Sequence, residues 1–141
     1  MIKRLFSNTE SKKFLKDAVW LLSNFAANSE KDSADIVEAG LISNLIFTAQ
    51  CKNKDLRKEA LYALQNLVVY SNEKEVIERL LKDNVMHLFF LVLENETIEG
   101  LEQLLALNAT NQLIKKSEMA RRIFEFLQGD KLLLHLQNSS Y

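Results

Sequence analysis

Two eight-residue stretches repeat each other at an offset of 42 positions: Asp17-Ala-Val-Trp-Leu-Leu-Ser-Asn24 and Glu59-Ala-Leu-Tyr-Ala-Leu-Gln-Asn66. Around both, over 14–25 and 55–69, apolar residues recur every three or four positions, which predicts amphipathic helices. A third helix is expected to begin with Glu99-Gly-Leu-Glu-Gln-Leu-Leu105, 40 residues after Glu59. A repeat of long helices therefore organises the chain.

Two shorter helices are expected after each long one. The first set covers 30–39, 73–83 and 117–128, and the second covers 41–50, 85–94 and 131–138. The joints hold Gly40, Asn84 and Gly129, residue types that tolerate the left-handed backbone found at helix ends. Composition agrees, because a chain of 141 residues with no proline and three glycines has few tight turns.

Units of three helices that repeat every 40–47 residues are typical of armadillo solenoids. One unit cannot bury its apolar stripe alone, so neighbouring units stack and share a core. The sequence therefore predicts an all-α fold, an armadillo-type right-handed α-solenoid with long helices on its concave face. A plain helical bundle explains the helices but not the repeat. One domain over 1–141 is expected, with units at 1–30, 30–71, 73–112 and 117–141, the first and last incomplete.

The first repeated stretch resembles the Glu-Ala-x-Trp-x-x-Ser-Asn motif of the importin-α family, the adaptors that carry nuclear localisation signals. Three further stretches are similar to the family's short-helix turn, the end of its Trp-Asn series and its closing repeat: Glu38-Ala-Gly-Leu-Ile42, Glu99–Leu105 and Gly129–Gln137. The resemblance implies the C-terminal repeats, around the minor signal-binding site. It implies import of cargo between cytoplasm and nucleus, with cargo peptides and transport factors as partners.

The chain also departs from that family's pattern. Tyr62 replaces the second tryptophan and Gln65 the second serine, while Glu102 and Ala106 are expected where a third Trp-Asn pair would stand. The earlier repeats and the basic N-terminal arm are missing from this sequence. We therefore expect a fragment of a longer chain or a short relative.

The residues themselves suggest a peptide groove. Trp20 and Asn24 share one helix face, and Tyr62 and Asn66 repeat the pair one unit later. An amide can pair with the N–H and C=O of any extended peptide, and aromatic rings accept the stem and charge of lysine or arginine. Acidic side chains three residues before each ring can neutralise that charge. The predicted peptide-binding residues are Trp20, Asn24, Tyr62, Asn66, Asp17, Glu59 and Ser23.

Other readings remain open at this stage. The aromatic residues could belong to the core, and the fold could be a scaffold subunit with a vestigial groove. An enzyme has little support, because His87 and His135 are isolated, Cys51 has no identifiable base, and no metal or cofactor motif occurs. Lys115, Lys116, Arg121 and Arg122 flank a helix start without the exposed aromatics that nucleic-acid binding needs.

Charge and hydropathy limit the remaining partners. The net charge of −1 favours neither nucleic acid nor an anionic membrane, and the longest apolar stretch, 88–93, is far too short to span a bilayer. Glu94, Glu96, Glu99 and Glu102 are expected to form a solvated edge. Apolar residues at 2–6 and at 132, 133 and 136 predict self-association through uncovered ends.

Overall fold

The computed structural model describes residues 12–98 and 100–127, and within them the chain forms helices joined by short links. The long helices are α2 (Lys12–Asn28), α5 (Lys54–Tyr70) and α8 (Gly100–Lys116). The shorter ones are α3 (Glu30–Glu38), α4 (Ile42–Thr48), α6 (Lys74–Lys82), α7 (Val85–Glu94) and α9 (Glu118–Phe126). No strand occurs in these two ranges, so the predicted all-α class is confirmed.

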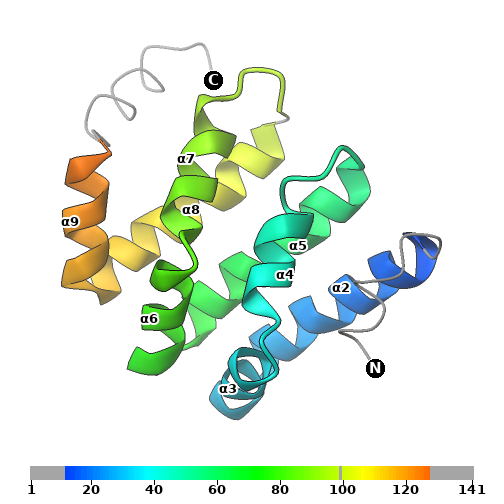
Figure 1. The fold of residues 1–141 in the computed structure, drawn as a ribbon, viewed down its shortest axis with the longest axis horizontal. Helices are drawn as coiled ribbons and strands as arrows, with labels where there is room; N and C mark the ends of the chain where they lie inside the picture. The colour runs from blue at the N-terminus through cyan, green and yellow to red at the C-terminus, as the bar shows by residue number, and fades with distance from the viewer. Residues whose placement is uncertain (1–11, 99, 128–141) are drawn as a thin grey trace.

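The long helices form one layer and the shorter helices cover it. Figure 1 shows α2, α5 and α8 side by side, with α3, α4, α6 and α7 in front of them. Contacts between α2 and α5 and between α5 and α8 agree with this arrangement, as do those that join α3 to α2, α4 to α5, and α7 and α9 to α8. The result is a row of stacked helical units, as the repeat predicted.

Local signals explain where the helices begin and turn. The Asn53 side chain accepts hydrogen bonds from the backbone N–H groups of Asp55 (3.0 Å) and Leu56 (3.2 Å), which caps α5. Gly40 and Asn84 have φ angles of 71° and 65°, the left-handed backbone that was predicted at these joints. The expected joint at Gly129 and the expected helix over 131–138 lie outside the described residues.

One hydrophobic core runs through the whole row, from Val19 in α2 to Ala120 in α9. Its centre is α5, where Ala60, Ala63 and Leu64 are fully buried. Small side chains at two of these positions let neighbouring helices approach closely. The stacking of units therefore supplies much of the core.

Replacing Leu64 by Ala should lower the free energy of unfolding by about 2–5 kcal/mol, because a cavity would remain between packed helices. Chemical denaturation measures this loss. Leu91→Ala is the matched control, since Leu91 is 57% exposed and its truncation should change stability by less than about 0.5 kcal/mol. A loss below about 1 kcal/mol for Leu64→Ala would show that α5 is peripheral.

Candidate functional site

Apart from Ser23, the predicted peptide-binding residues lie on the arc of each long helix opposite its buried residues. On α2, Trp20 is 55% exposed, and Asn24 and Asp17 are also exposed. On α5, Tyr62 and Asn66 are half-buried, and the ring of Tyr62 packs against the edge of the core. The predicted peptide-binding residues are thus exposed on α2, while those on α5 are partly used for packing within the protein.

Ser23 and Asn66 join the first two long helices. The Nδ2 atom of Asn66 donates hydrogen bonds to the backbone oxygen (3.0 Å) and the hydroxyl oxygen (3.1 Å) of Ser23, which is buried. These bonds use the amide's donor group, so its carbonyl oxygen is the part left to accept from another molecule. Ser23 accordingly lies behind the face, where it positions Asn66.

The third long helix stacks in a different register from the one predicted. α5 and α8 each have 17 residues and begin 46 positions apart, whereas α2 and α5 begin 42 apart. The expected alignment of Glu99 with Glu59, 40 positions apart, is therefore wrong by six residues, although the helix does begin where expected. In the observed register, Asn108 lies beside Tyr62 at the same height along the helix, and Gln112 beside Asn66. Glu102 and Ala106, which were predicted at these two positions, lie elsewhere on α8.

The cause of the difference lies between the long helices. Helix α7 has 10 residues where α4 has 7, and three residues link α5 to α6 where one links α2 to α3. The link between α6 and α7 is one residue shorter than the link between α3 and α4, so the second repeat is longer by four residues. Local similarity around Glu99 could not reveal this added length. We use the term long-helix face for the six residues that the observed register brings level: Trp20, Tyr62, Asn108, Asn24, Asn66 and Gln112.

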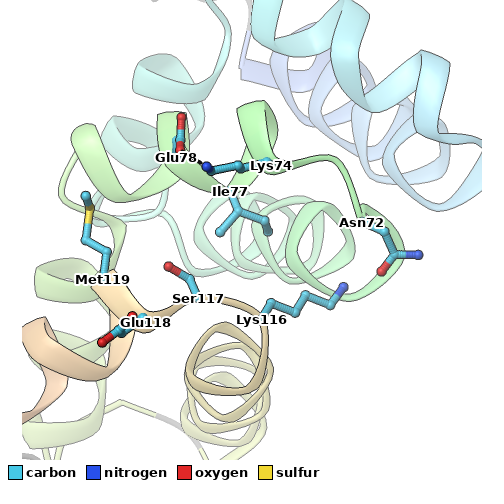
Figure 2. Close-up of a pocket in the computed structure, with 8 residues that line it drawn as sticks. All are labelled: Asn72, Lys74, Ile77, Glu78, Lys116, Ser117, Glu118 and Met119. Carbon is cyan, nitrogen blue, oxygen red and sulfur yellow. Dashed lines mark ion pairs between the residues drawn. The ribbon is translucent and has the colours of Figure 1, made fainter.

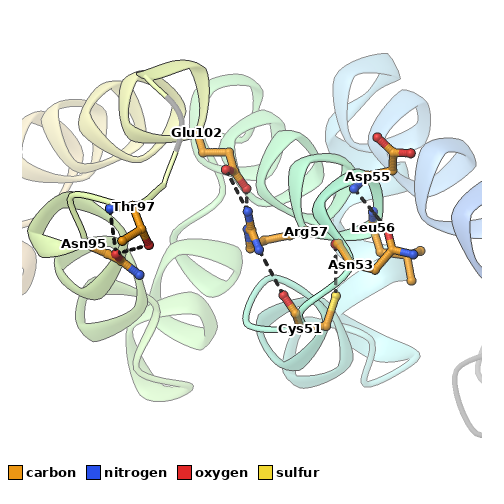
Figure 3. A network of polar contacts seen from close by, with 8 residues as sticks. All are labelled: Cys51, Asn53, Asp55, Leu56, Arg57, Asn95, Thr97 and Glu102. Atoms are coloured by element: carbon orange, nitrogen blue, oxygen red, sulfur yellow. Dashed lines mark hydrogen bonds and ion pairs between the residues drawn. The ribbon is translucent and has the colours of Figure 1, made fainter.

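The register assigns Glu102 a structural role. Glu102 lies level with the buried Leu56 and is itself completely buried, so the expectation that it belongs to a solvated edge is wrong. Its carboxylate accepts two hydrogen bonds from the Arg57 guanidinium, at 2.5 Å from Nε and 3.1 Å from Nη2 (Figure 3). Arg57 also donates to the backbone oxygen of Cys51 at 3.3 Å. Sequence analysis missed this pair because its members lie 45 residues apart.

Replacing Arg57 by Met should cost about 3–5 kcal/mol in unfolding free energy, because the buried Glu102 carboxylate would lose its counter-charge. Adding Glu102→Leu, which copies the equivalent Leu56, should restore most of that loss. Denaturant titration of both variants checks this. Arg79→Met removes an exposed ion pair with Asp83 and should cost less than about 1 kcal/mol. Equal losses for the single and double variants would show that the loss does not come from the uncompensated charge of Glu102.

Lys116 closes the C-terminal end of α5. Its Nζ donates to the backbone oxygens of Val68 (2.6 Å), Val69 (2.8 Å) and Ser71 (2.9 Å), so carbonyls left open at the helix end gain a cationic partner. Burial lowers the pKa of Lys116, and the negative charge of Glu30 opposes that shift. Lys116 thus joins α8 to α5.

A hollow of 590 Å³ opens beside this contact, between α6 and the junction of α8 with α9 (Figure 2). Its charged side chains already have partners in the chain: Lys74 pairs with Glu78 at 3.7 Å, and Lys116 caps α5. Nearby, Arg121 donates to the Ile114 carbonyl at 2.9 Å. These bonds explain part of the basic cluster without a nucleic acid.

The groups considered for catalysis are scattered. His87 is exposed on α7, and the half-exposed Cys51 contacts the Asn53 backbone oxygen with its sulfur at 3.4 Å. Across 12–98 and 100–127, no three metal-binding side chains converge, and no helix is long and apolar enough to cross a membrane. His135 and the apolar ends at 2–6 and 132–136 lie outside the described residues.

Comparison with solved structures identifies the fold as an armadillo-repeat solenoid. A designed armadillo repeat protein in complex with the peptide (KR)4 superposes with a TM-score of 0.87 and 19% identity, covering 99% of this chain and 56% of that one. A second designed armadillo protein gives 0.86 and 21%, covering 99% and 57%. A third, computationally designed for modular peptide recognition, gives 0.85 and 18%, covering 97% and 56%.

These likenesses concern the fold, since identity is low throughout. The chain spans a little over half the length of these three relatives. A scan against protein-family models finds no match, and a search of curated proteins finds none either.

Proposed function

We propose that this chain is a non-enzymatic binding module that holds an extended, Lys/Arg-rich peptide across its long-helix face. The observation that carries the proposal is the pair formed by Trp20 and Asn24, exposed together at the open end of that face. The finer proposal is that the peptide is a nuclear localisation signal and that the module works in import, in cytoplasm and nucleus. That part rests on the resemblance of Asp17–Asn24 to the importin-α motif.

The chemistry of the face suits such a peptide. The indole of Trp20 can pack against a lysine or arginine stem while the cation meets its ring face. Asp17, exposed, and Glu59, half-buried, add negative charge beside the two rings. Asn24, Asn66 and Gln112 offer a row of three amides for the peptide backbone, one more than the sequence suggested. The designed relative solved with (KR)4 supports a basic peptide by analogy of fold alone.

Affinity should be modest. A cation–π contact contributes about 0.5–2 kcal/mol, and an amide–backbone hydrogen bond about 0.5–1.5 kcal/mol. Micromolar binding requires about 8 kcal/mol after the peptide has been ordered. Three units therefore predict weak binding, which a longer array would strengthen.

A scaffold that packs permanently against protein partners is the second candidate. The α5 part of the long-helix face favours the scaffold. There Tyr62 packs against the core, and the donor group of Asn66 is already bonded to Ser23. In that case the groove would be vestigial and partners would bind elsewhere.

Titration with (KR)4 should change the fluorescence of Trp20, the single tryptophan of the chain, and the effect should weaken as salt screens the charges. Asn24→Ala should raise the dissociation constant about 2- to 10-fold by removing one backbone hydrogen bond. Asn44→Ala, on α4 in the other layer, is the matched control and should leave it unchanged.

A peptide of equal length with glutamine at every basic position serves as the second control. If it shifts the emission as strongly as (KR)4, or if neither acts at millimolar concentration, the peptide-binding proposal fails and the scaffold takes its place. Circular dichroism of Asn24→Ala confirms that the fold is intact.

A further inference from the structure

Helix α2 exposes an apolar face, whereas the corresponding faces of the other long helices, α5 and α8, are buried. We call Phe14 (62% exposed), Leu21 (40%) and Phe25 (41%) the α2 face. In the observed register their equivalents on α5 are Leu56, Ala63 and Leu67, and those on α8 are Glu102, Ala109 and Leu113. All six are buried. Since Glu102 reaches back to Arg57 on α5, this side of each long helix is the side turned toward the preceding one.

Helix α8 presents the complementary side. We call Leu104, Leu107, Asn111 and Ile114 the α8 face; with Phe124 of α9 they line a hollow of 350 Å³. The α5 equivalents of Leu107 and Ile114 are Leu61 and Val68, both buried. The hollow is about ten times a water molecule's share of liquid volume, so large side chains can enter it. Leu104, which lines it, is 61% exposed.

The two faces also match in their polar groups. Between α2 and α5, Asn66 bonds to Ser23. The α2 equivalent of Asn66 is Asn24, and the α8 equivalent of Ser23 is Asn111; both are exposed. Two amides can donate and accept at once, so this pair can replace the Asn–Ser contact.

We propose that the partner of these faces is a second copy of this chain, with its α2 face stacked on the α8 face of the first. The contact would continue the interfaces that already join α2 to α5 and α5 to α8, in the same register. The pair of Asn24 with Asn111 would stand where Asn66 bonds to Ser23 between α2 and α5. Because two different faces meet, the assembly is head-to-tail and can extend beyond two copies. It would also join the long-helix faces of successive copies into one longer row.

Sedimentation of the peptide-free protein tests the proposal without reference to peptide binding. The wild-type chain should show a mass that rises with concentration through dimer and larger species. Phe14→Glu and Leu104→Glu each place a charge on one face at an exposed position, so both should fold. Each alone should weaken association at least 10-fold, while Phe47→Glu, on an exposed residue of α4, should have no effect.

Mixing the two variants gives the decisive result. The Phe14→Glu chain retains an intact α8 face and the Leu104→Glu chain an intact α2 face, so an equimolar mixture should form a one-to-one dimer that grows no further. A mixture that stays monomeric, or a Leu104→Glu chain that dimerises as well as wild type, overturns the head-to-tail contact. Wild type that is monomeric up to millimolar concentration overturns it too, and would mean that another segment of the chain covers these faces.

Discussion

The fold of the described residues depends on the burial of α5 between α2 and α8. Ala60, Ala63 and Leu64 lose all exposure there, and no single unit of the row can achieve this alone. The shorter helices then cover the side of the layer where the core continues into Ile42, Leu45 and Phe89. Removing one long helix would therefore expose the core of its neighbours.

Apolar stacking holds the helices together but does not by itself decide how far one slides along the next. Polar contacts between neighbouring long helices do so, among them Asn66 with Ser23, Glu102 with Arg57, and Lys116 with the end of α5. Hydrogen bonds are directional and fail within a fraction of an ångström, whereas dispersion contacts tolerate a shift. These contacts therefore determine which side chains become level on the long-helix face.

The long-helix face changes character along the row. At α2 and α5 it carries two aromatic residues with Asp17 and Glu59 close by, which suits cationic side chains. At α8 the aromatic position is taken by Asn108, and the acidic position by the buried Leu105. The row of side-chain amides alone continues through all three helices, whereas the aromatic and acidic side chains are concentrated at α2 and α5.

The sequence by itself determined the helices, because the spacing of apolar residues over 14–25 and 55–69 reports which face each helix must bury. It also identified the pairing of Trp20 with Asn24, which depends only on helical geometry. The tertiary structure alone decided the register of α8 and the burial of Glu102, since both depend on the length of the intervening helices and on a contact between residues 45 positions apart. From the sequence, Glu102 is expected to be solvated because it stands among other acidic residues. Only folding brings Arg57 close enough to neutralise its charge in the core.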